Sequence, residues 1–138
     1  MEPLDLSIAP PRPPRGELAG VVFLPRSIDK VRATLPGGKL GPYNIAGFTQ
    51  MMLDALGISL ESFTSCVAKA NDDEDVARFI RTNTMAQERT KWNTFLEARE
   101  PRGGNRVEAI ETYPWLASRP DLILALDVLA EDDKQIFR

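Results

Sequence analysis

Apolar residues after Gly16 recur at the three- and four-residue spacing of the α-helix along most of the chain. In the first such segment, Ile28, Val31 and Leu35 share one helical face. The same spacing recurs later, with expected buried residues Met52, Leu53 and Leu56; Leu60, Phe63 and Val67; Val76, Phe79 and Ile80; Trp92, Phe95 and Leu96; and Leu122, Ile123, Leu126 and Leu129. We therefore predict an all-α, mainly helical fold, an irregular bundle of six or seven short helices.

Capping residues and helix breakers predict where the first helices begin and end. Pro25 can open the first helix, because proline suits the first turn, and the Pro-Gly-Gly run at residues 36–38 should end it. Thr49 and Ser59 are the expected caps of the next two helices. The acidic run at residues 72–75 should start the fourth, because carboxylates accept hydrogen bonds from the free amides there. Binding of Ca²⁺ by this run is the alternative.

Two more helices are expected in the later part of the chain. A longer helix is expected from residue 85 or 86 to about residue 100, and Pro120 should open a last helix that ends near residues 131–133. Residues 21–23 and 43–45 are the only strand candidates. These short extended pieces are too few to form an enclosing sheet.

Residues 1–16 differ from the rest, because five of the first 14 residues are proline. We expect an extended polyproline leader there and a single helical domain over residues 17–138. The leader should lie over its own domain. The alternative is that its P-x-x-P spacing binds an aromatic groove on a partner protein.

Composition limits the chemistry that the chain can perform. There are no histidines and one cysteine among 138 residues, so Ser-His and Cys-His catalytic pairs, His-containing zinc sites and internal disulfides are excluded. The net charge of −3 gives no general attraction for nucleic acid or membrane. The first residues do not resemble a signal peptide, and no apolar run is long enough to span a membrane. We therefore expect a cytoplasmic protein without metal or cofactor.

The first helix carries the clearest candidate site. With Pro25 as first helical residue, Leu24 would be the cap, and leucine offers no acceptor to the free amides. Arg26 adds positive charge at an end that is already positive. We therefore predict an anion-accepting site, assembled from Arg26, Ser27, Asp29, Lys30, Lys39 and Tyr43.

Other interpretations of these residues stay open. The face with Arg26 and Asp29 can instead be solvated and joined by an ion pair, and the missing anion can be internal, such as Glu17 or Glu111. The Gly-Gly-Lys run at residues 37–39 is interpreted as the end of the helix, because it lacks the residue spacing of a phosphate-binding loop.

Three further side chains are candidates for chemistry. Cys66 should be a small buried residue beside Phe63 and Val67. Asp121 follows Pro120 and is interpreted as an acidic residue in the first turn of the last helix. Asp127 interrupts an apolar helix and is either a structural ion-pair partner or an acid-base group.

Several runs resemble a bacterial family that is described only as a domain of unknown function. They are LPRSIDKVRA at residues 24–33, LPGGKLGPY at 35–43, LGI at 56–58, RPDL at 119–122 and DVL at 127–129. The resemblance implies a small, mostly helical, cytoplasmic bacterial protein and carries no activity. Relatives in this family place His, Cys and Asp after the tyrosine, whereas this chain has NIAGF at residues 44–48.

Three functions remain as hypotheses. The first is a non-catalytic module that binds a small anionic ligand or a protein partner. The second is an enzyme acting on a phosphorylated or carboxylated metabolite, with Asp29 or Asp127 as acid-base group and Arg26 and Lys30 as clamp. The third is a homodimeric scaffold with an apolar patch around Trp115 or on the last helix.

Overall fold

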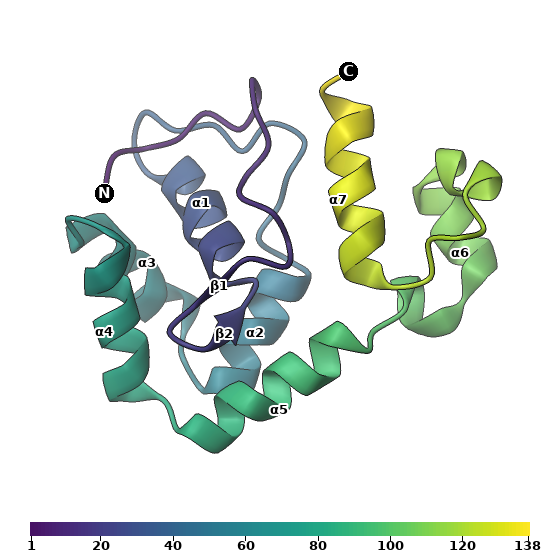
Figure 1. The fold of residues 1–138 in the computed structure, drawn as a ribbon. Helices are drawn as coiled ribbons and strands as arrows, with labels where there is room; N and C mark the ends of the chain where they lie inside the picture. Colours follow the sequence, from purple (N-terminus) through teal and green to yellow (C-terminus); the bar gives the residue numbers. More distant parts are fainter. The chain divides into compact units, whose positions relative to one another are not determined.

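Helices form nearly all the regular structure of the computed structural model, which describes residues 1–138 (Figure 1). The elements are β1 (Glu17–Leu18), β2 (Val21–Val22), α1 (Leu24–Thr34), α2 (Phe48–Leu56), α3 (Leu60–Lys69), α4 (Asp73–Asn83), α5 (Ala86–Glu97), η1 (Pro101–Gly104), α6 (Arg106–Thr112), η2 (Pro114–Ser118) and α7 (Ala125–Ile136). The predicted helical fold class is confirmed, and the strands contribute only one antiparallel hairpin.

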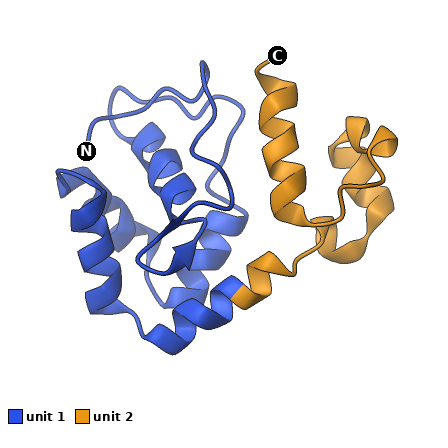
Figure 2. Cartoon of the chain, in the orientation of Figure 1, with its two compact units in different colours: residues 1–93 blue, residues 94–138 orange.

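The chain forms two compact units, residues 1–93 and residues 94–138, and the boundary between them lies within α5 (Figure 2). The leader belongs to the first unit. The single domain predicted over residues 17–138 stays a prediction. No helix by itself has the length and apolar character needed to cross a bilayer. Only α2 and α3 taken together have this length and apolar character, and the pair is bent by 99°.

The core of the first unit is built around α1. Its residues Leu24, Ile28 and Val31 are fully buried, and the helix packs against α3, which contributes Phe63 and Val67. Other buried residues of this core come from α2, α4 and α5, namely Met52, Leu53, Leu56, Val76, Ile80 and Trp92. The apolar periodicity therefore identified most of this core correctly.

The caps are partly as predicted. Ser59 accepts from the amide of Ser62 at 3.1 Å, and Asp72 accepts from the amide of Asp75 at 3.1 Å, so both predicted caps are confirmed. Thr49 is not a cap: α2 begins one residue earlier, and the Thr49 side chain is buried. Gly57 ends α2 in the left-handed conformation that glycine adopts without strain, at φ 70°.

The predicted strand at residues 21–23 corresponds to β2, whereas residues 43–45 form no strand. The hairpin turn holds Ala19 and Gly20 at positive φ, as a two-residue turn between antiparallel strands requires. The N-terminal part of α5 holds this hairpin: Trp92 Nε1 donates to the Val22 carbonyl at 2.9 Å, and Asn93 Oδ1 accepts from the Val22 amide at 2.9 Å.

The leader lies over α1 through specific contacts. The amide of Leu4 donates to the Arg32 carbonyl at 3.3 Å, and the amide of Leu6 donates to the Lys39 carbonyl at 2.8 Å. The amide of Arg12 donates to Asp29 Oδ2 at 2.8 Å. Consequently, Arg26 and Asp29 on α1 are buried, with 1% and 4% of their surface exposed. The alternative interpretation of this stripe as a solvated face is therefore wrong for these two residues.

The guanidinium of Arg12 joins three segments of the first unit. Its Nη2 lies 3.1 Å from Asp29 Oδ1 on α1 and 3.1 Å from Asp73 Oδ1, in the first residue of α4. Hydrogen bonding to Asp73 is the main reason why the Arg12 pKa is raised, and hydrogen bonding to Asp29 adds to it. The predicted Arg26–Asp29 pair is replaced, because Asp29 takes its hydrogen bonds from Arg12.

The second unit has its own small core of Ala109, Leu116 and Val128, against which Ile110, Tyr113, Trp115 and Leu122 pack. Arg106 donates to the carbonyls of Leu122 at 2.6 Å and Arg119 at 3.0 Å, which holds residues 119–122 as a loop. The prediction that Pro120 opens the last helix is therefore wrong, and α7 begins at Ala125.

The apolar pattern fails to predict burial at two positions in the second unit. Ile123 precedes α7 and is 50% exposed, and Phe95 on α5 is 42% exposed, although both were expected in the core. The end of α5 at Glu97 comes before the predicted residue 100, whereas α7 extends to Ile136, beyond the predicted residues 131–133.

Arg12→Ala should lower the free energy of unfolding by about 1 to 3 kcal/mol, because it leaves the buried Asp29 with only backbone hydrogen bonding from the leader and a distant Arg32. Urea unfolding measures this change. The matched control is Arg81→Ala, which removes an exposed pair with Glu74 and should cost about 0.5 kcal/mol or less. Equal losses in the two variants would contradict the bridging role of Arg12.

Candidate functional site

The structure brings three of the six predicted anion-site residues together. The Cζ atom of Arg26 lies 5.8 Å from the centroid of the Phe23 ring and 5.4 Å from that of Tyr43. The Nζ atom of Lys30 lies 5.5 Å and 5.9 Å from the same two centroids. Both cations therefore lie over the faces of the same two aromatic rings. The negative potential of each ring face attracts the positive charge in such cation–π contacts.

The other three predicted residues lie elsewhere or have internal partners. The hydroxyl of Ser27 is buried and hydrogen-bonded to Thr49 Oγ1 at 2.9 Å. Asp29 is held by Arg12, as described above. Lys39 is exposed, and its backbone pairs with the leader, where its amide donates to the Leu4 carbonyl at 2.9 Å. An anion ligand at α1 would therefore depend on Arg26, Lys30 and Tyr43.

The entrance of α1 differs by one residue from the prediction. The cap is Phe23 and not Leu24, and it provides no side-chain acceptor, so the expected lack of an acceptor is confirmed. Phe23 holds φ at 79°, a strained value for a residue with a side chain, and its buried ring packs edge-on against Phe48 with centroids 5.9 Å apart. Glu17 forms no ion pair there and is exposed; Glu111, in the second unit, is also exposed.

The carboxylates considered for catalysis have structural surroundings. Asp121 lies in a loop, where hydrogen bonding from Arg119 lowers its pKa; it is not in a helix. Asp127 is half-buried in the first turn of α7, where a carboxylate suits the positive end of the helix. Asp29 is held by the leader. None of the three lines the cavity between α3 and α4 described below.

Arg26→Ala should lower the free energy of unfolding by about 1 to 3 kcal/mol, because a buried guanidinium loses its ring contacts and its hydrogen bond to the Arg12 carbonyl. The melting temperature of the wild type should not change in tens of millimolar phosphate, because Arg26 is 1% exposed. Thermal melts of both proteins with and without phosphate test this. Phosphate that stabilises the wild type and not the variant would show that the anion is external.

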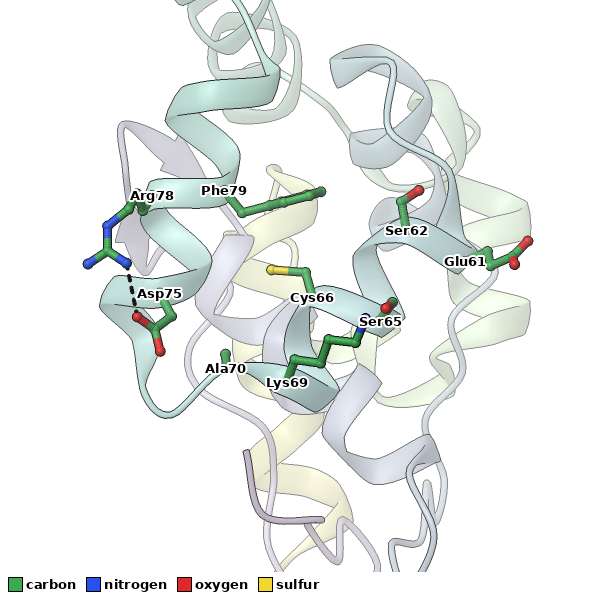
Figure 3. Close-up of a pocket in the computed structure, with 9 residues that line it drawn as sticks. All are labelled: Glu61, Ser62, Ser65, Cys66, Lys69, Ala70, Asp75, Arg78 and Phe79. Atoms are coloured by element: carbon green, nitrogen blue, oxygen red, sulfur yellow. Dashed lines mark hydrogen bonds and ion pairs between the residues drawn. The ribbon is translucent and has the colours of Figure 1, made fainter.

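A cavity of about 590 Å³, shallow and widely open to solvent, lies between α3 and α4 within the first unit (Figure 3). Figure 3 shows the ring of Phe79 and the thiol of Cys66 directed into the space between the two helices. The lining residues are Glu61, Ser62, Ser65, Cys66, Lys69, Ala70, Asp75, Arg78 and Phe79. The sequence analysis did not identify this site.

The α3 wall of the cavity follows from helical periodicity. Ser62, Ser65, Cys66 and Lys69 are spaced three or four residues apart and therefore form one stripe along α3. The opposite stripe, with Phe63 and Val67, is buried in the core. A polar stripe is typical of a solvated helix face, so the sequence pattern contained the stripe but not its position opposite α4.

The charges on the α4 side of the cavity neutralise each other. Arg78 Nη1 lies 3.2 Å from Asp75 Oδ1, and Asp75 also accepts from the amide of Asn71 at 2.8 Å. The hydrogen bond from Asn71 is the main cause of the lowered pKa of Asp75, and Arg78 lowers it further. On α3, the side chains of Glu61 and Lys69 form no ion pair and no hydrogen bond within the protein.

Cys66 is half-buried at the cavity, whereas the sequence predicted a small buried residue beside Phe63 and Val67. Burial raises the pKa of its thiol, and the nearby negative charge of Asp75 raises it further. A raised pKa leaves less thiolate at neutral pH, and the lining residues include no histidine. No group of three His, Cys, Asp or Glu residues is placed to hold a metal ion.

Alkylation of Cys66 by iodoacetamide should be slow at pH 7 in the folded protein and faster after unfolding, because folding raises the thiol pKa. The rate in the folded protein should keep rising above pH 9. Asp75→Asn should increase the rate at pH 8, whereas Glu74→Gln, a neighbouring acid outside the cavity, should not. Mass spectrometry of timed samples measures the rates, and equal rates in folded and unfolded protein would contradict the assignment.

Comparison with known proteins gives a family but no activity. The model of a family described as a domain of unknown function, DUF5069, matches residues 8–135. No curated protein matches the chain.

Proposed function

Since the chain belongs to the DUF5069 family, whose description assigns no activity, we propose from the geometry that it is a non-catalytic module that binds a small ligand between α3 and α4. The observation that carries the proposal is the cavity of about 590 Å³, a size typical of small-molecule sites. It combines one aromatic ring with hydroxyl, thiol and charged groups that can orient a ligand.

The side chains of the cavity are available to a ligand. The hydroxyls of Ser62 and Ser65 make no hydrogen bond within the protein, and the charges of Glu61 and Lys69 are not paired. By contrast, Ser27 and Asp29 at α1 are held by Thr49 and Arg12. Unused polar groups around a cavity favour binding there over binding at α1.

The absence of catalytic machinery supports a binding role over an enzymatic one. The chain has no histidine, and its one thiol has a raised pKa. Asp29, one of the two carboxylates considered as an acid-base group, is hydrogen-bonded to Arg12 on both oxygens. Such hydrogen bonds hold the carboxylate in a fixed position.

A screen of small polar molecules tests the proposal with two readouts, the melting temperature and protection of Cys66 from iodoacetamide. A compound at ten times its Kd should add about 1.4 kcal/mol of stability and slow the alkylation of Cys66. Ser65→Trp, which places a large ring in the cavity, should weaken or abolish both effects.

Lys91→Trp serves as the matched control, because residue 91 is exposed on α5 and does not line the cavity. Both effects should persist in this variant. Compounds that stabilise the protein without protecting Cys66, and that also stabilise Ser65→Trp, would place the binding site elsewhere.

A further inference from the structure

We infer that two copies of this chain exchange their leaders, so that residues 1–12 of each copy bind to the other copy. The surface that receives them is formed by α1, the first residue of α4 and the backbone of Lys39, all within the first unit. We call it the leader-binding surface. The inference rests on the way the leader is bound, because its contacts are those of a peptide ligand.

The first half of the leader binds through its backbone, as an added strand does. The amide of Leu6 donates to the Lys39 carbonyl at 2.8 Å, and the amide of Lys39 donates to the Leu4 carbonyl at 2.9 Å. Asp5, between these two leader residues, forms a parallel bridge with Lys39. Peptides that add a strand to a protein use the same backbone bonds. Such bonds require only an extended backbone in register, so the leader of another copy forms them equally well.

The side chains of the leader make this surface specific for the leader sequence. Leu6 is 2% exposed and Pro11 is buried. The guanidinium of Arg12 lies 3.1 Å from Asp29 and 3.1 Å from Asp73. Because Asp29 is buried, it requires a cation in this position. A second copy carries the same arginine in the same register, which is why we assign the exchanged segment to a second copy of this chain.

The turn at residues 13–16 is the hinge of the exchange. The amide of Gly16 donates to the Pro13 carbonyl at 3.0 Å, and the Gly16 carbonyl is fixed to the domain by the amide of Phe23 at 2.9 Å. Pro13 and Pro14 favour the extended polyproline conformation, in which four residues span about 12 Å. Opening the turn loses one backbone hydrogen bond and the burial of Pro14. The contacts of residues 1–12 with the leader-binding surface form again on the other copy.

The hinge also sets the protein concentration at which the exchange occurs. A short linker holds a segment near its own surface at an effective concentration of about 1 mM. The exchanged dimer makes the same leader contacts as the closed monomer, so protein concentrations near this value populate the dimer. At micromolar concentrations, the closed monomer drawn in Figure 1 predominates.

Light scattering of the wild-type protein is the first test. One sample is refolded at about 1 mM and another at about 5 µM, and both are separated by size-exclusion chromatography after dilution. A dimer should be present only in the sample refolded at high concentration. It should persist through the separation, because its dissociation requires the whole leader to detach. Absence of a dimer from both samples would overturn the inference.

Two introduced thiols show which chain each leader is bound to. In a Cys66→Ser background, Asp5→Cys and Lys39→Cys place one thiol on each side of the parallel bridge. The sample refolded at high concentration is diluted to about 5 µM before oxidation, which removes chance collisions between chains, and is run on a denaturing gel without reductant. The exchanged dimer should run as a covalent dimer. A dimer whose fully oxidised chains separate as monomers on the gel would have a different interface and would overturn the inference.

Proline-to-glycine variants test the hinge. Pro13→Gly should reduce the dimer fraction of the concentrated sample about threefold, because glycine weakens the preference for the extended form. Pro10→Gly is the matched control, since both prolines are exposed but Pro10 lies in the exchanged segment and outside the hinge. This control should keep the dimer fraction of the wild type. Equal dimer fractions in the two variants would overturn the assignment of the hinge and, with it, the exchange.

Discussion

The burial of Asp29 is the constraint on which the first unit depends. A carboxylate in the interior of a protein needs hydrogen-bond donors, since its desolvation is not otherwise compensated. The leader provides them through the backbone amide and the guanidinium of Arg12, and the same guanidinium reaches Asp73 at the start of α4. One ion-pair network therefore determines where the leader, α1 and α4 lie relative to one another.

This network explains why the most distinctive run in the sequence is structural. Residues 24–33 contain charged side chains at spacings that suggest an exposed face, yet Arg26 and Asp29 are buried and take part in internal contacts. The side chains that line the cavity lie on α3, in an ordinary-looking polar stripe, and on α4. A conspicuous motif thus supports the fold, while an inconspicuous helix face borders the cavity.

The helices could be predicted from the sequence because their causes are local. The apolar periodicity around Ile28 and the caps at Ser59 and Asp72 depend on residues within a few positions of each other. The burial of Arg26 could not be predicted in this way, because it depends on a leader that is distant in sequence. For the same reason, the sequence did not show that Cys66 faces α4 across a cavity.

The long sequence separations in the first unit have a consequence for how it folds. Arg12 meets Asp73 across 61 positions, and Val22 meets Asn93 across 71, so the earliest segments bond to the latest ones. Contacts of this kind form slowly, because a large loop must close before they contribute any stability. During synthesis on the ribosome, the hairpin and the leader must wait for α4 and α5 to emerge. Until then, the apolar residues of α1 remain without their full covering.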